Sequence, residues 1–224
     1  MLEGFPEVRA ASLTVKRRTS ADLARTTRAT VLFADLRGYT ALAERLAPEL
    51  IVPLLDEFFG VLAKATAAQG GTVFHMAGDG MMAGFGGPDP THDGAREGLA
   101  AGHAMLQQFG RVASRWRDEL GIETGIGVGL HLGDVAVGLL GPPQQKSMTL
   151  VGDTVNVAAR LCSRARAGEV LLSCTVATAL DVDRGERELY IGPIPVLHLP
   201  QFALRGRAAP LDIWCVPAME RAAI

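Results

Sequence analysis

The sequence predicts one α+β domain, in which an antiparallel or mixed sheet is flanked by helices that lie mainly on one face. Short β-branched or glycine-rich runs alternate with longer amphipathic segments along the 224 residues. Hydrophobic residues make up 48% of the chain and the formal net charge is −2, so one substantial core can be buried. We expect the domain over 28–217, a basic linker or helix over 1–27 and a short tail over 218–224.

Composition excludes several classes of protein. No apolar run is long enough to cross a bilayer, and the N-terminus lacks the pattern of a secretory signal. The three cysteines have no CxxC spacing, so neither a disulfide framework nor a zinc site is indicated, and we expect a cytoplasmic protein. The balanced charge argues against nucleic-acid binding, although a basic stretch over 15–28 would suit a linker or a partner-docking segment.

The first half of the chain is expected to bring one carboxylate to a strand end and another to a hairpin tip. A strand over 28–36 places Asp35 at its end, and a turn through Gly38 follows. A helix over 48–69 is predicted by apolar residues at three- and four-residue spacing. Two short strands over 72–85 then form a hairpin with Asp79 at the bend.

The second half continues the alternation. We expect the hairpin over 124–141 to turn at Gly133-Asp134, and the helix after it to be capped by Asp153 or Thr154. The predicted elements are a helix over 95–120, a hairpin over 124–141, a helix over 152–165, a strand over 169–173, a helix over 175–180 and strands over 202–206 and 210–216.

Asp35 and Asp79 can meet if their strands are neighbours in the sheet. Such a pair suits magnesium or manganese, which accept one or two carboxylates and leave other positions to water and substrate phosphate. Either aspartate could instead be a structural turn residue. The turn that follows, through Gly38 to Thr40, offers backbone N–H groups and a hydroxyl to an anion, which favours a nucleotide.

Two arginines are candidate cations for a phosphoryl group. Arg160 lies four residues after Asn156, so both side chains share one face of the predicted helix over 152–165. Arg205 follows the apolar run over 202–204. A cation at either position could stabilise charge in a phosphoryl transition state, but an exposed arginine can equally be only solvated.

Five motifs together resemble the catalytic domain of class III nucleotidyl cyclases. They are "VLFADLRGYTALAERL", "FHMAGDGMMAGFG", "GVGLHLGDVAVGLLG", "LVGDTVNVAARL" and "FALRG", and they occur in the family's order and approximate spacing. The resemblance implies a ferredoxin-like, palm-like fold and a head-to-tail homodimer. It also implies an enzyme that converts a nucleoside triphosphate to a 3′,5′-cyclic nucleotide and pyrophosphate, for intracellular signalling.

The resemblance assigns roles residue by residue. It implies two divalent cations, Mg²⁺ or Mn²⁺, and a dimer in which the metal aspartates and the Asn/Arg helix come from different protomers. The implied roles are metal binding by Asp35 and Asp79 with the Leu36 carbonyl, a triphosphate cradle of the amides of Leu36, Arg37, Gly38, Tyr39 and Thr40, ribose and α-phosphate contacts by Asn156 and Arg160, and a terminal-phosphate contact by Arg205, where the family generally has lysine.

The base-recognition positions depart from the family's adenine-specific pattern. His75 stands where that pattern has lysine, and Thr149 matches a threonine-bearing bacterial subclass that includes adenylyl cyclases. A neutral imidazole can donate to either purine, so His75 does not choose the base by itself, and it could also be a packing residue. We expect ATP as substrate, with guanylyl cyclase activity as the alternative.

Other readings compete with an active enzyme. A catalytically silent, nucleotide-binding dimerisation module would not need both aspartates together with Asn156 and Arg160, and a diguanylate cyclase would carry a different hairpin motif. We expect His131 to be structural, and Met81 and Met82 to fill the core. No sensor domain fits in 1–27, so regulation would come from that segment, bicarbonate or pH, an unidentified partner or a further domain.

Overall fold

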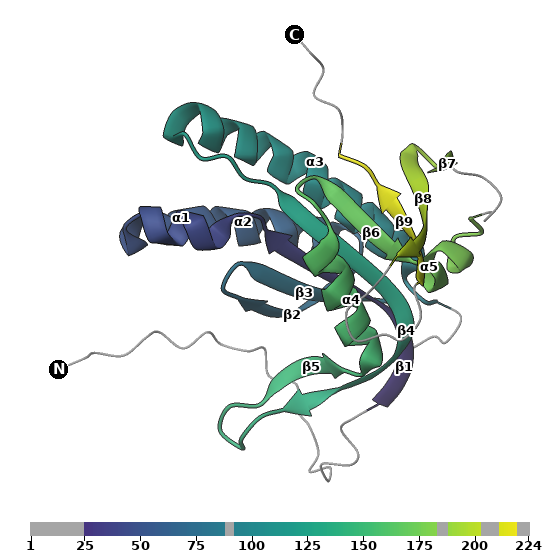
Figure 1. Ribbon diagram of the computed structural model, residues 1–224. Helices are drawn as coiled ribbons and strands as arrows, with labels where there is room; N and C mark the ends of the chain where they lie inside the picture. Colours follow the sequence, from purple (N-terminus) through teal and green to yellow (C-terminus); the bar gives the residue numbers. More distant parts are fainter. Residues whose placement is uncertain (1–24, 88–91, 183–187, 203–210, 219–224) are drawn as a thin grey trace.

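The computed structural model describes residues 25–87, 92–182, 188–202 and 211–218. Helices and strands alternate as the sequence predicts for an α+β domain (Figure 1). In chain order they are β1 (Arg25–Leu36), α1 (Tyr39–Arg45), α2 (Pro48–Ala68), β2 (Thr72–Ala77), β3 (Gly80–Phe85), α3 (Ala95–Leu120), β4 (Ile126–Leu140), β5 (Ser147–Val151), α4 (Asp153–Arg164), β6 (Glu169–Ser173), α5 (Cys174–Ala179), β7 (Glu188–Ile191), β8 (Ile194–Phe202) and β9 (Leu211–Val216).

All the described strands belong to one mostly antiparallel sheet. Its order is β2-β3-β1-β4-β6-β9-β8-β7, and β5 pairs separately with the far end of β4. β1 lies between β3 and β4, antiparallel to both, whereas β4 and β6 run parallel. The β4–β5 pair projects beyond the rest of the sheet as an arm (Figure 1). The end of β1 that carries Asp35 therefore lies between two strands.

The helices are unequally divided between the two faces of the sheet. Side chains of α2, α3 and α5 share the largest hydrophobic cluster with the inward residues of β1 and β4, such as Leu32 and Leu130. Helix α4 covers the opposite face, where its backbone approaches Gly129 of β4. Helices on mainly one face are therefore confirmed, and α4 is the exception.

The predicted turn at Gly133-Asp134 is wrong. β4 runs without interruption from Ile126 to Leu140, and the turn comes later, before β5. Glycine is favoured at position 133 for another reason: a Cβ there would lie 2.6 Å from the Thr154 hydroxyl of α4. Gly133 thus marks the close approach of a helix and not a change of chain direction.

The predicted side-chain cap of α4 is also wrong. Gly152 is the N-cap residue and makes no side-chain capping bond, while Asp153 is the first helical residue. The Thr154 hydroxyl donates instead to the Asp134 carbonyl of β4 at 2.7 Å. That bond ties the start of the helix to the sheet, so the threonine serves the packing of α4 rather than its termination.

Several other elements agree with the sequence prediction. The helices over 48–69 and 95–120 and the hairpin over 72–85 are confirmed. The first strand begins earlier than predicted, at Arg25, and α1, β5, β7 and most of β8 were not predicted. Most of the strand predicted over 202–206 lies outside the described residues.

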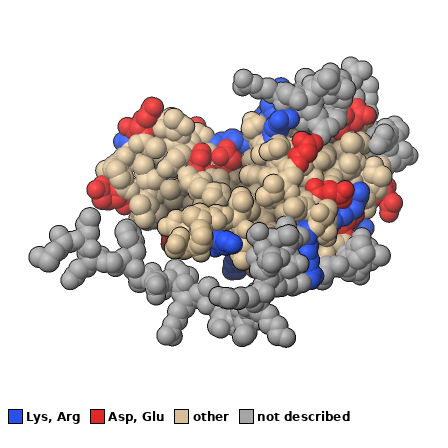
Figure 2. Space-filling model, turned by 90° about the horizontal axis from the view of Figure 1, so that it is seen from below, with Lys and Arg blue, Asp and Glu red and all other residues tan. Residues whose placement is uncertain are grey.

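Three features of the described residues bear on the broader expectations. Met81 and Met82 are both buried, which confirms their assignment to the core. None of the helices is long and apolar enough to span a membrane. Figure 2 shows acidic and basic side chains interspersed over one face of the molecule.

Candidate functional site

Asp35 and Asp79 meet at the end of two neighbouring strands. In the β1–β3 ladder Asp35 is directly opposite Gly80, the residue after Asp79. The Leu36 amide donates to the Asp79 carbonyl at 2.9 Å, which fixes the hairpin bend against the end of β1. The sheet therefore brings together the two carboxylates that the sequence singles out.

The electrostatics of Asp35 show that the two carboxylates interact. Burial raises the pKa of Asp35, the Arg37 guanidinium lowers it, and the charge and hydrogen bonding of Asp79 raise it again, with a net upward shift. An unfavourable pair of adjacent carboxylates is the arrangement that a cation relieves.

The surroundings of Asp35 fit a hard divalent cation. Its two partners across the ladders are Gly80 and Gly127, so no side chain from the neighbouring strands stands directly over the carboxylate. Among the described residues no cluster of three or more His, Cys, Asp or Glu side chains could hold a metal. Two carboxylates alone suit Mg²⁺ or Mn²⁺, which take remaining ligands from water and phosphate, and do not suit zinc.

The Arg37 side chain joins this site to α4, and sequence reasoning did not predict that contact. Its Nη1 donates to Asp35 Oδ2, and its Nη2 donates to the Cys162 carbonyl in the last turn of α4. The guanidinium occupies the space that a side chain at Gly127 would need. No local pattern in the sequence could have revealed a contact across 125 positions.

The turn after β1 offers fewer free amides than predicted. The Leu36 amide donates to Asp79 and the Arg37 amide donates to the Gly125 carbonyl at 2.8 Å. Gly38 adopts a left-handed conformation with φ 79°, and α1 begins at Tyr39. The amides at the start of a helix have no partner within it, so the predicted cradle narrows to Gly38, Tyr39 and Thr40.

Asn156 and Arg160 lie on α4, on the same side of the sheet as Asp35. Asn156 is exposed and Arg160 half-buried, while Val157 and Leu161, the residues that directly follow them, are buried against the sheet. Within the described part of the chain, neither the Asn156 nor the Arg160 side chain makes a hydrogen bond or ion pair, with Asp35 or with any other residue. The helix thus presents an amide and a guanidinium outward from its own protomer.

The predicted base-recognition residues lie on two strands that approach each other. His75 is exposed on β2, and Thr149 is half-buried on β5. Their neighbours Phe74 and Leu150 both pack against Gly84 of β3. Arg205 lies outside the described residues, so its placement stays a prediction.

His131 has a structural contact. Its Nδ1 lies 3.3 Å from the Thr175 hydroxyl of α5, and that hydroxyl also donates to the Leu132 carbonyl. The contact links β4 to α5 well away from the aspartates along the strand, which supports the predicted structural role.

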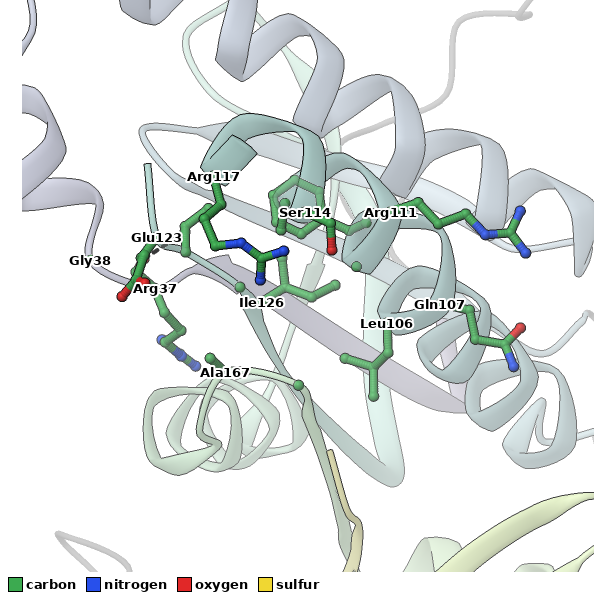
Figure 3. A pocket seen from close by; sticks show the side chains of 16 residues that line it. Arg37, Gly38, Leu106, Gln107, Arg111, Ser114, Arg117, Glu123, Ile126 and Ala167 are labelled. Atoms are coloured by element: carbon green, nitrogen blue, oxygen red, sulfur yellow. Dashed lines mark hydrogen bonds between the residues drawn. The ribbon is translucent and has the colours of Figure 1, made fainter. Parts of the chain in front are cut away.

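A cavity of about 720 Å³ lies next to the turn after β1. Helix α3 forms one wall with Ser114 and Arg117, and the turn after β1 contributes Arg37 and Gly38. Figure 3 shows Arg37 and Glu123 at the same end of this cavity. Neither aspartate lines this cavity, and both are half-buried.

Comparison with known proteins gives consistent results. The family model described as adenylate and guanylate cyclase catalytic domain matches residues 22–196. An adenylate cyclase of Anabaena cylindrica is 33% identical over 146 residues, which are 62% of this chain and 27% of that protein. The chain therefore spans only a small part of this relative.

Solved structures are also similar. The adenylyl cyclase CyaB from P. aeruginosa has a TM-score of 0.77 and 27% identity, with 90% of this chain and 99% of that chain covered. The guanylyl cyclase Cya2 has a TM-score of 0.73 and 28% identity, with 90% and 98% covered.

Proposed function

Because the chain belongs to the adenylate and guanylate cyclase catalytic domain family, we propose that it converts ATP to 3′,5′-cyclic AMP and pyrophosphate. The observation that carries this proposal is the meeting of Asp35 and Asp79, where the Asp79 carboxylate helps to raise the pKa of Asp35. A protein that kept this fold without catalysis would gain nothing from two mutually repelling carboxylates at one strand end.

In this proposal the two aspartates, with the Leu36 carbonyl, hold Mg²⁺ or Mn²⁺ ions. Ions bound there would supply Lewis-acid chemistry, lowering the pKa of the ribose 3′-hydroxyl and stabilising negative charge on the pyrophosphate. The free amides of Gly38, Tyr39 and Thr40 bind the triphosphate, and the left-handed turn at Gly38 lets the backbone approach it.

Asn156 and Arg160 act on the ribose and the α-phosphate. The 3′-oxygen forms a bond to the α-phosphorus as the bond to pyrophosphate breaks, and the hydroxyl proton leaves to solvent. The Arg160 guanidinium stabilises the charge on the phosphoryl oxygens, and Arg205 binds the terminal phosphates. Because Asn156 and Arg160 face outward from their own protomer, we propose that they serve the aspartates of a partner in a head-to-tail homodimer.

Exposed apolar side chains support the homodimer. Leu139, Leu140 and Met148 lie exposed on the β4–β5 arm, where Leu139 and Met148 are paired across the strands. Met76 of β2 is exposed as well, and β2 lies in contact with β5. Apolar side chains gathered on one part of a surface are typical of protein interfaces.

Guanylyl cyclase activity is the second candidate, because His75 can donate to guanine O6 as readily as to adenine and the guanylyl cyclase Cya2 is as similar as CyaB. Thr149, which matches the threonine-bearing subclass, favours ATP.

The test is incubation of the purified protein with each nucleoside triphosphate in turn, with Mn²⁺ or Mg²⁺, and resolution of products by mass. We expect cyclic AMP from ATP. Asp35→Asn and Asp79→Asn should each lower the rate about a hundredfold or more, because a ligand to the charge-stabilising ions is lost. Asp56→Asn, at an exposed position of α2, is the matched control and should retain the wild-type rate. Absence of any cyclic product with either metal would contradict the proposal.

A further inference from the structure

We propose that Arg37 is a displaceable counter-ion, which neutralises Asp35 until a divalent cation binds and which links cation binding to helix α4. The inference rests on the proposed function, because it takes Asp35 as a cation ligand. The inference assigns a positioning role to the Arg37 side chain. This role is separate from the contact with triphosphate that the sequence analysis expected of the Arg37 backbone amide.

The contacts of Arg37 place one guanidinium between two elements. Nη1 donates to Asp35 at the end of β1, and Nη2 donates to the Cys162 carbonyl of α4. A cation in the last turn of a helix is stabilised by the negative end of the helix dipole. Arg37 therefore holds Asp35 and the end of α4 at once.

Because of these contacts, Arg37 competes with any cation that binds Asp35. The Asp35 side chain is only 32% exposed, so charges near it are weakly screened. A divalent cation on the carboxylate and a guanidinium on the same carboxylate repel each other. Binding of the ion is therefore favoured when the guanidinium moves away.

Two further features lower the cost of that movement. Nε of Arg37 is buried without a hydrogen-bond partner among the described residues, so the guanidinium is incompletely satisfied where it lies. The side chain also lines the 720 Å³ cavity, which gives the guanidinium a place to move. Glu123 lines the same cavity and offers it a new carboxylate partner (Figure 3).

Movement of Arg37 would also affect α4, the helix that carries Asn156 and Arg160. When Arg37 leaves Asp35, its hold on the Cys162 carbonyl changes too, because both contacts come from one rigid guanidinium. Cation binding to the aspartates of a protomer would therefore alter the C-terminal turn of that protomer's α4, the helix proposed to serve the partner's site.

The test is titration of the full chain with Mn²⁺ alone by calorimetry. Arg37→Gln should bind Mn²⁺ about tenfold more tightly than wild type, because a nearby like charge typically changes ionic equilibria by a factor of ten or more. Arg37→Lys keeps the charge and should bind as wild type does. Arg117→Gln removes a different arginine of the same cavity and is the matched control, with unchanged affinity expected. Unchanged or weaker binding by Arg37→Gln would overturn the inference, as would equal tightening by Arg37→Gln and Arg37→Lys.

A second measurement tests the link to α4 without catalysis. Mn²⁺ should change amide hydrogen exchange in the last turn of α4 in wild type and leave it unchanged in Arg37→Gln; no change in wild type would overturn the link. Failure of the proposed function would give a different result from failure of the inference. If Asp35 is not a cation ligand, Mn²⁺ should bind equally to wild type and Asp35→Asn, or to none of the variants. That result would also overturn the inference.

Discussion

The Asp35 carboxylate is held between charges of opposite sign. Arg37 favours its ionised form, whereas burial and the neighbouring Asp79 carboxylate favour the protonated form and prevail. A divalent cation that touches both aspartates would favour ionisation of both. The environment that disfavours the charge of Asp35 is therefore the one that a bound cation would stabilise.

Two cysteines should be unreactive in the native protein. Burial raises the pKa of Cys162 and of Cys215 from 9.0 to about 12. The thiolate is the reactive form, and its fraction at pH 8 falls about a thousandfold with such a shift. We expect Ellman's reagent at pH 8 to label Cys174, which is only half-buried, and to reach the other two after denaturation. Rapid labelling of all three thiols in the native protein would contradict this.

His75 should influence the choice of base. Its side chain is exposed on β2, four residues before Asp79, and can contact a ligand without unpacking the core. We expect His75→Lys to raise the ratio of cyclic AMP to cyclic GMP formation about tenfold, which corresponds to one net hydrogen bond of about 1–1.5 kcal/mol. The exposed His92 provides the control, and His92→Lys should leave the ratio unchanged. An unaltered ratio in His75→Lys would place His75 among the packing residues.

Among the elements, the seat of α4 on β4 determines where Asn156 and Arg160 point. The helix crosses the strand so closely that a Cβ at Gly129 would lie 2.6 Å from the Ala158 carbonyl and closer still to the Cys162 amide. Gly129 and Gly133 of β4 thus form part of the surface on which the helix lies.

Gly129→Ala should therefore push α4 away from the sheet. We expect the free energy of unfolding to fall by about 1–3 kcal/mol, the usual cost of overpacking, and cyclase activity to fall with it because the helix moves. Gly60→Ala is the control: nothing lies within 4 Å of its Cβ position in α2, and alanine there should stabilise the helix by about 1 kcal/mol or less. Chemical denaturation measures both. A neutral effect of Gly129→Ala would show that α4 is not seated as described.

The distinction between local and non-local contacts explains which features the sequence could predict and which it could not. The carboxylates of Asp35 and Asp79 could be predicted, because a strand end and a hairpin bend are local patterns. Gly133 gave the same local signal as a turn, although its cause is a helix that lies next to it only in space. The Arg37 contact with α4 has no local pattern at all.

For the molecule as a whole, the proposed function predicts a site that is complete only in a dimer. Asp35→Ala and Arg160→Ala homodimers should both be inactive, because each lacks one half of both sites. Mixed in equal amounts and allowed to exchange, they should recover about a quarter of the wild-type rate, since half of the dimers then contain one intact site of two. Asp35→Ala mixed with Asp79→Ala is the control and should remain inactive. Equal rates in the two mixtures would contradict a shared site.

The position of β1 in the interior of the sheet has a consequence for biosynthesis. β1 can pair with β3 early, but its other neighbour, β4, pairs Leu36 with Ile126 and is made roughly a hundred residues later. At about 5–20 residues per second, one edge of β1 stays unpaired for some seconds on the ribosome. During that time β1 is exposed to mispairing in the nascent chain, and the domain should fold slowly for its length because this pairing is non-local.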